Sequence, residues 1–336
     1  MLHSLNALCN SIALNSSSFT PPVYSTPSSD PADPRLSNLI KLASDASLAE
    51  ANVVIFGIPT NEGIERNGGR PGADQAPQAI RQWLGKLTPF AGPQFKRHID
   101  ELKIVDLGDI PSGPLEEMHE VAADVATELT THGKIIIALG GGHDVTYPLA
   151  KGFGKATNDF GLINIDAHLD VRPKKNGLHH SGSSFRLLIE EGIVQGRNFA
   201  EIGIQSFAMA KEHFDWVISQ GSRILMFEDA TEAHLPNAFE ECEVAITRGD
   251  FEMPIYLSFD IDSIRSSDAP GASAPAPIGF LAEEAYELSV AAGLSANVRA
   301  FDLVEVSPPY DQDGRTARLA ARMIAGFLAG VANRNL

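Results

Sequence analysis

LINIDAHLDVRP, residues 162–173, begins as a continuous apolar run and then carries Asp166, His168 and Asp170 at every second position. Side chains at alternate positions of an extended chain point to the same side, so two carboxylates and one imidazole would converge just beyond a buried strand. Two neighbouring carboxylates repel each other, and burial makes this repulsion costly. The stretch therefore predicts a strand that ends in ligands for a cation.

Short apolar runs of this kind alternate with longer amphipathic stretches over most of the chain. Helix-like stretches include residues 73–85, 115–133 and 314–331. Nearly continuous apolar strands separated by helices indicate an α/β fold with a parallel sheet covered on both faces. Ligands of such sheets gather at the carboxyl ends of the strands. The expected strands are residues 52–58, 103–108, 134–140, 161–166, 199–204, 223–227, 254–260 and 299–306.

The composition favours one large domain. The chain has 336 residues, of which 43% are hydrophobic, and no internal linker interrupts it. Residues 1–34 are rich in Ser, Pro and Asn without a sustained period, and we interpret them as a flexible N-terminal arm before a single catalytic domain, residues 35–336. Cys9 and Cys242 stand in no ligand spacing, which fits ordinary thiols and a cytoplasmic location.

The charge of the chain narrows the class of partner. A formal net charge of −17 would repel phosphate backbones and anionic lipids, so neither nucleic acid nor a membrane surface is expected. No stretch approaches the roughly 18 consecutive apolar residues of a membrane helix. A small-molecule substrate is the expected partner.

Polar clusters follow four of the expected strands, at GGGHD (140–144), DAHLD (166–170), DID (260–262) and EVSPPYD (305–311). Taken alone, GGGHD could be a strand-to-helix turn and DID a pair of solvated turn residues. Together they offer two imidazoles and four carboxylates, which could hold two divalent ions with shared carboxylates. The oxygen-rich set favours Mn²⁺ over Zn²⁺, without excluding Zn²⁺, Fe²⁺ or Co²⁺. The candidate ligands are His143, Asp166, His168, Asp170, Asp260 and Asp262.

In this order and spacing, GGGHD, INIDAHLDVRP, SFDIDSIRSSDAPG and EVSPPYDQDGRTARLAARMI resemble the ureohydrolase family of arginase, agmatinase and formiminoglutamase. The resemblance spans roughly residues 50–332. It implies an arginase-like three-layer α/β/α fold around a central, mostly parallel eight-stranded sheet, with two Mn²⁺ ions per chain bound by the six candidate ligands. It also implies that Glu305 faces the amidine-like group of the substrate, that Asp170 relays a proton, and that the chain forms a homo-oligomer.

The chain departs from the arginase and agmatinase pattern in two places. Those enzymes usually have GGDH, whereas here Gly142 precedes the histidine and Asp144 follows it, which looks more like formiminoglutamases. Their catalytic histidine stands in a segment such as HGxP, and the corresponding segment here is HHSGSSFRLLIE, residues 179–190. One alignment places His180 at the catalytic position, and another places Ser181 there.

The expected reaction is hydrolysis of a C–N bond in a linear amidine by a hydroxide that bridges two Mn²⁺ ions. The resemblance favours N-formimidoyl-L-glutamate as substrate, giving L-glutamate and formamide in histidine catabolism. The alternative substrate is a guanidino acid, agmatine or arginine, with release of urea. A metal-binding protein without catalysis is a further alternative, but such a protein would not need Glu305. The carboxylates of the favoured substrate require cationic partners, for which the candidates are Arg172, Arg265, Arg186 and Arg70.

Overall fold

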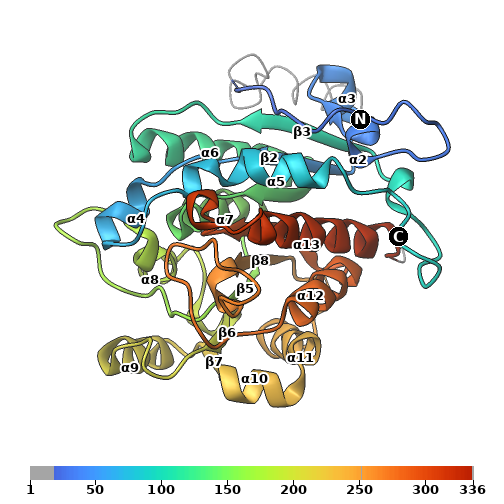
Figure 1. The fold of residues 1–336 in the computed structure, drawn as a ribbon. Helices are drawn as coiled ribbons and strands as arrows, with labels where there is room; N and C mark the ends of the chain where they lie inside the picture. Colours follow the sequence, from blue (N-terminus) through green and yellow to red (C-terminus); the bar gives the residue numbers. More distant parts are fainter. Residues whose placement is uncertain (1–18, 251, 335–336) are drawn as a thin grey trace.

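The computed structural model describes residues 19–250 and 252–334, which form one parallel sheet with helices on both faces (Figure 1). The strands are β1 (Lys41–Leu42), β2 (Val53–Gly57), β3 (Ile104–Asp109), β4 (Ile135–Leu139), β5 (Gly161–Ile165), β6 (Phe199–Ile204), β7 (Arg223–Met226), β8 (Ile255–Asp260) and β9 (Val298–Val304). Their order is β1-β3-β2-β4-β9-β8-β5-β6-β7, and neighbouring strands pair in parallel. The predicted α/β class with a mostly parallel sheet is confirmed.

The number of strands corrects the expectation of eight, because the sheet has nine. Eight strands match the expected ranges closely, and the additional one is β1. Both of its residues, Lys41 and Leu42, are exposed, and they pair with β3 at the edge of the sheet. A two-residue exposed edge strand leaves no apolar run in the sequence, so the hydrophobic pattern could not reveal it.

The helices follow the predicted alternation. They are α2 (Leu36–Leu39), α3 (Asp45–Glu50), α4 (Glu62–Asn67), α5 (Ala76–Leu84), α6 (Leu115–Thr131), α7 (Thr146–Thr157), α8 (Ser184–Glu190), α9 (Lys211–Ser219), α10 (Phe227–Ala233), α11 (Leu235–Thr247), α12 (Ala282–Leu294) and α13 (Arg315–Ala332). Short 3₁₀ turns follow several strands, including η5 (His143–Val145), η6 (Ser181–Ser183) and η8 (Ile261–Ser263).

Side chains of the central strands alternate between two hydrophobic clusters. In β2, Val53 and Ile55 pack into a cluster that includes α5, α11, α12 and α13, whereas Val54 and Phe56 pack with α6 and α7. This is the period of two that a strand buried on both faces requires. Figure 1 shows α13 crossing one face of the sheet with α5 and α12 beside it. The molecule therefore has three layers, with the sheet in the middle.

Residues 1–18 of the expected arm lie outside the described residues, and the rest of the arm contacts the domain. The Tyr24 hydroxyl donates to Asp106 Oδ2 (2.5 Å). The fully buried Arg81 donates to the same carboxylate from Nε (2.8 Å) and Nη2 (3.0 Å). This part of the arm is anchored on a buried ion pair, and the division of the chain into an arm and one catalytic domain remains a prediction.

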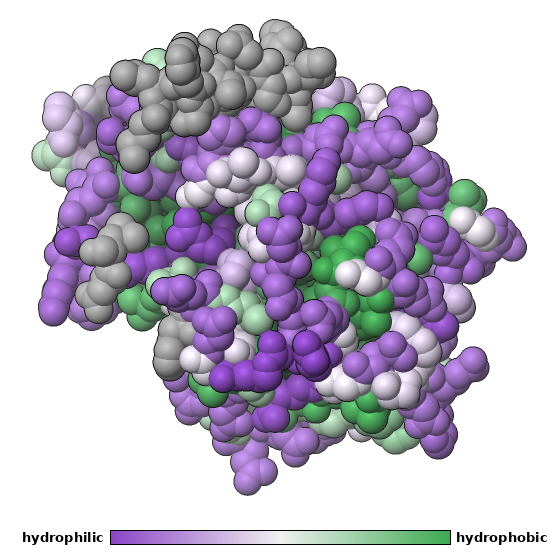
Figure 2. Space-filling view, turned by 180° about the vertical axis from the view of Figure 1, so that it is seen from behind, coloured by the Kyte–Doolittle hydropathy of each residue, from purple (hydrophilic) through white to green (hydrophobic). Residues whose placement is uncertain are grey.

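The surface is largely hydrophilic on the face seen in Figure 2, where apolar residues appear only in separate small areas. Within the described part of the chain, no helix has both the length and the apolar character needed to cross a lipid bilayer.

Candidate metal centre

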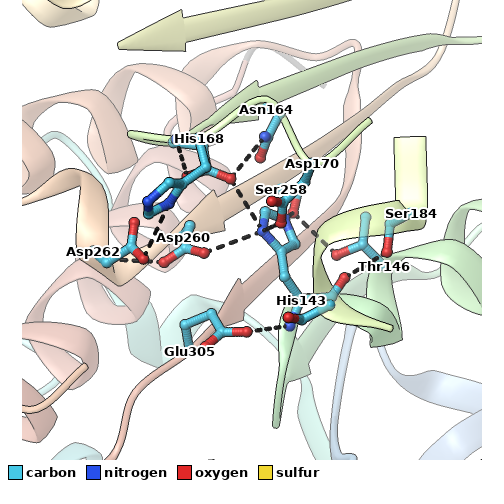
Figure 3. A network of polar contacts seen from close by, with 12 residues as sticks. His143, Thr146, Asn164, His168, Asp170, Ser184, Ser258, Asp260, Asp262 and Glu305 are labelled. Carbon is cyan, nitrogen blue, oxygen red and sulfur yellow. Dashed lines mark hydrogen bonds and ion pairs between the residues drawn. The ribbon is translucent and has the colours of Figure 1, made fainter. Parts of the chain in front are cut away.

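The six predicted ligands lie together at the carboxyl ends of neighbouring strands, and Figure 3 labels all of them except Asp166. His143 follows β4 at the start of η5, and residues 166–170 follow β5. Asp260 is the last residue of β8, and Asp262 lies in η8 directly after it. Because parallel strands end at the same edge of the sheet, segments more than a hundred residues apart in the sequence converge here.

Four of the side chains form the first ligand group. His143 Nδ1 lies 3.2 Å from Asp166 Oδ2, 3.1 Å from Asp170 Oδ2 and 3.1 Å from Asp260 Oδ2. Two ligand atoms at right angles around one ion, each about 2.1–2.2 Å from it, are about 3 Å apart. The spacing of this group therefore suits a single cation with octahedral ligands.

The second group shares Asp166 with the first. His168 Nδ1 lies 3.5 Å from Asp166 Oδ1 and 3.4 Å from Asp262 Oδ2. Asp166 thus presents Oδ2 to one group and Oδ1 to the other. A carboxylate that faces two groups with different oxygens is arranged to bridge two ions.

The raised pKa values of the buried side chains show that positive charge stabilises this site. Burial, followed by repulsion from Asp262 and Asp166, raises the pKa of the Asp260 carboxyl well above its usual range. Burial alone would lower the pKa of His143, but the carboxylates around the ring outweigh it and raise the pKa well above 6.5. Asp262 Oδ1 is also buried without a hydrogen-bond partner among the described residues. The donor set fits two divalent cations.

A chain of hydroxyl groups fixes the orientation of the His143 ring. Its Nε2 lies 3.0 Å from Ser258 Oγ, and the Ser258 hydroxyl donates to Asp302 Oδ1 at 2.6 Å. Thr146 and Tyr256 donate to the other oxygen of Asp302, at 2.8 and 2.7 Å. Since Ser258 gives its proton to Asp302, we assign the ring proton to Nε2, which leaves the Nδ1 lone pair facing the carboxylates. Carboxylate networks of this kind orient metal-binding histidines.

Glu305 joins the site from β9, which lies between β4 and β8. Its backbone has a φ of +64°, a left-handed conformation that is uncommon for a non-glycine residue and that marks functional sites. Its Oε1 accepts from the His143 N–H at 2.7 Å, and its Oε2 accepts from the Ser273 hydroxyl. Burial is the main cause that raises the Glu305 pKa to about 8. A cation placed beside this carboxylate would stabilise its charged form.

Comparison with known proteins agrees with this geometry. The sequence pattern of the arginase family matches residues 51–330. The chain belongs to the arginase family. Members of this family that are similar to it hydrolyse C–N bonds in linear amidines, and the chain is a hydrolase of this class.

Three relatives illustrate the similarity. The crystal structure of Trypanosoma cruzi formiminoglutamase with two Mn²⁺ ions has a TM-score of 0.84 and 34% sequence identity, over 90% of this chain and 99% of that one. Formimidoylglutamase from Ralstonia nicotianae is 31% identical over 89% of this chain and 91% of the relative. The mitochondrial guanidino acid hydrolase of Homo sapiens is also 31% identical, over 88% of this chain and 82% of the relative.

One of the four predicted arginines lies beside this arginase-family metal centre. Arg172 lines a cavity of about 250 Å³ together with His168, Asp170 and His213. Among the described residues, its guanidinium donates one hydrogen bond, from Nη1 to Asn67 Oδ1 (3.1 Å). Much of its donor capacity is therefore available to a ligand in the cavity.

The structure gives the other arginines different partners. Arg186 donates to Glu190 one helical turn away and lies over the Trp216 ring, 4.5 Å from its centroid. Arg265 donates to Asp268 Oδ2 at 2.9 Å. Each of these pairs, at spacings of four and three residues, engages the Nε donor of the guanidinium group, and a role for Arg186 or Arg265 in substrate binding remains a prediction.

Arg70 acts on the site indirectly. Its Nε and Nη2 donate to the carbonyl oxygens of Ser273 (3.2 Å) and Ala272 (2.7 Å), and its guanidinium lies over the Tyr310 ring. Ser273 is the residue whose hydroxyl donates to Glu305. Arg70 therefore holds the loop that positions Glu305, and its direct contact with a substrate remains a prediction.

The two candidates for the catalytic histidine position lie in the loop before α8. His180 is buried, and its Nε2 lies 3.1 Å from the Pro173 carbonyl oxygen. The Ser181 hydroxyl accepts from Asn67 Nδ2 at 3.1 Å. Within the described residues, neither side chain hydrogen-bonds to a predicted metal ligand. A role for His180 as a proton shuttle remains a prediction.

Several residues of the site were not predicted from the sequence. Ser258 and Asp302 lie inside strands, and Ser273 lies in a loop without a motif of its own. His213 is an isolated histidine at the start of α9. Asp302, Ser273 and His213 carry no local spacing signal, because their partners come from other segments of the chain. The two polar residues at alternate positions of YLSFD, residues 256–260, are the one signal that pointed to Ser258.

Proposed function

We propose that this chain hydrolyses N-formimidoyl-L-glutamate to L-glutamate and formamide with two Mn²⁺ ions. The observation that carries the proposal is the position of Arg172 in the cavity beside two candidate metal ligands, His168 and Asp170. The similarity to formiminoglutamases that bind two Mn²⁺ supports it. So does the oxygen-rich ligand set, which suits Mn²⁺.

The six ligand residues would hold the two ions, with Asp166 between them. When bound, the two metal ions supply a Lewis acid and a water molecule whose lowered pKa lets it act as nucleophile at neutral pH. The substrate contributes a formimidoyl carbon bonded to the glutamate nitrogen. Addition of water to that carbon and cleavage of its bond to the glutamate nitrogen give formamide and the free amino group of glutamate.

The residues of the chain orient the substrate and move a proton. The Glu305 carboxylate, held by Ser273 and by the His143 N–H, would pair with the cationic amidine and fix its plane. Asp170 belongs to the ligand cluster and also lines the cavity, so it is placed to carry a proton to the leaving nitrogen. Arg172 would bind a substrate carboxylate at the rim, with His213 beside it.

A guanidino acid is the second candidate substrate. A relative named for that activity has the same identity to this chain, 31%, as a named formimidoylglutamase. The cavity also offers one arginine, which suits a substrate with one carboxylate as well as one with two. The same chemistry on a guanidino carbon would release urea instead of formamide.

The test is an assay of the Mn²⁺-loaded protein with N-formimidoyl-L-glutamate, 4-guanidinobutyrate, agmatine and arginine, measuring formamide and urea in parallel. We expect formamide from the first substrate at the highest kcat/KM. Urea without formamide would reject this proposal and favour the guanidino acid. An Asp260→Asn preparation serves as the control for contaminating enzyme, because it lacks a ligand of the first group.

Three further proposals come from the sequence and the family. We propose that the chain acts in histidine catabolism, that it is cytoplasmic and that it forms a homo-oligomer. Size-exclusion chromatography with light scattering would test the last of these directly.

A further inference from the structure

A second cavity lies at the amino ends of the strands, whereas the metal centre lies at their carboxyl ends. Its volume is about 310 Å³, and it is lined by residues at the amino ends of β2, β4 and β9 and at the end of α13. Five of the lining residues carry nitrogen bases or cations and one carries a carboxylate, which is an unusual local balance in a chain with a net charge of −17. The five are Arg97, His132, Lys134, Arg299 and Arg334, and the carboxylate belongs to Glu101.

Arg334 is the central cation of this amino-end cavity. It is 3% exposed, and it donates from Nε to the Gly293 carbonyl oxygen (2.6 Å) and from Nη2 to the Val298 carbonyl oxygen (2.8 Å). Its Nη1 is buried and has no hydrogen-bond partner within residues 19–250 and 252–334. Carbonyl oxygens satisfy its N–H groups without neutralising its charge. A buried cation in this condition is costly unless an anion pairs with it.

Arg299 adds a second guanidinium to the same wall. Its Nη2 donates to the Gly133 carbonyl oxygen at 2.9 Å, again without a carboxylate. Burial and then repulsion from Arg299 lower the pKa of Arg334 to about 9, against a smaller opposing effect of Glu243. Glu101 is more than half exposed and lies 3.9 Å from Arg97. The two guanidinium groups therefore face the cavity with little compensation from the described carboxylates.

We propose that the amino-end cavity binds a small oxyanion, which pairs with Arg299 and Arg334. A guanidinium presents parallel N–H groups that match two oxygens of a carboxylate, sulfate or phosphate. The volume is sufficient for such an ion. The occupant is a free small oxyanion from solution, for which sulfate serves as the probe.

The test measures the thermal stabilisation of the full chain by millimolar sodium sulfate at constant ionic strength, balanced with sodium chloride. Sulfate has a general stabilising effect on proteins, which acts equally on a variant and on the wild type. We expect Arg299→Gln to weaken the apparent sulfate affinity about tenfold or more, because one charged hydrogen-bonding partner is removed. Arg223→Gln is the matched control, since that arginine lies on the edge strand β7 and pairs with Glu241 (3.6 Å), and it should keep the wild-type response.

One additional variant completes the design. Arg334→Lys keeps the positive charge but removes the planar fork of guanidinium N–H groups, so we expect a weaker sulfate response even if its fold is slightly less stable. An identical sulfate response of the wild type, Arg299→Gln and Arg334→Lys overturns the proposal.

Discussion

Replacement of Ser258 by alanine tests the orientation of His143 most directly. Ser258 Oγ accepts from His143 Nε2 at 3.0 Å and donates to Asp302 at 2.6 Å, so its removal leaves a buried imidazole N–H without its acceptor. An unsatisfied buried polar group costs about 1–3 kcal/mol of folding stability. Loss of an orienting partner typically weakens metal binding about 10–100-fold, which corresponds to about 1.4–2.7 kcal/mol. We therefore expect Ser258→Ala to lose affinity at one of its two metal positions.

The assay is a titration of the metal-free protein with Mn²⁺, in which binding is measured by calorimetry or from the electron paramagnetic resonance signal of the free ion. Tyr256→Phe is the matched control, because it removes a 2.7 Å hydrogen bond to the same Asp302 carboxylate without touching His143. The control should lower the melting temperature and leave both Mn²⁺ affinities unchanged. Equal Mn²⁺ affinities in Ser258→Ala and the wild type would refute the assignment of Nδ1 of His143 as a ligand oriented through Nε2.

Four other predictions follow from the site. Glu305→Gln should lower kcat/KM about 30-fold or more while metal content stays at two ions per chain, since loss of one partner of a buried charged pair costs about 2–5 kcal/mol; loss of metal would show a structural role instead. Arg172→Lys should raise KM for N-formimidoyl-L-glutamate and leave agmatine kinetics unchanged, because lysine lacks the bidentate fork. Asp260→Asn should bind at least one ion fewer by elemental analysis, and chelation should lower the melting temperature of the wild type but that of the variant by less. Burial lowers the pKa of His179 from 6.5 to about 3, so the unfolded chain binds more protons than the folded chain between these pH values. The free energy of unfolding should therefore decrease as the pH is lowered from 6.5 toward 3, by at most about 1.4 kcal/mol per pH unit, and His179→Asn should flatten this slope in denaturant titrations.

The strand ends could be predicted because each combines a strong apolar run with an abrupt change to polar residues. Residues 161–166 and 254–260 were placed almost at the observed bounds of β5 and β8, and parallel pairing then brings their ends together. The exposed strand β1 carries no such pattern. The convergence of the six candidate ligands is thus a consequence of the fold class, while their roles still await the metal titrations.

The partners of the charged side chains were harder to predict. The sequence contains Arg186 and Glu190 at a spacing of four and Arg265 and Asp268 at a spacing of three, and such pairs form readily on one side of a turn. These spacings could have predicted the two local ion pairs. The contacts of Arg70 could not have been inferred, because its acceptors lie about two hundred residues away in a loop without regular structure.

The different exposure of the two candidate histidine ligands predicts an order in which the two ions are bound. The His143 side chain is completely buried, whereas that of His168 is 28% exposed and lines the cavity. An ion bound beside His143 must therefore enter before the position beside His168 is filled, and it can leave only after that position is emptied. Rapid chelation should give a half-loaded enzyme that keeps its inner ion. Because Asp166 contacts both positions, this intermediate should also take up a second ion with an affinity different from that of the first.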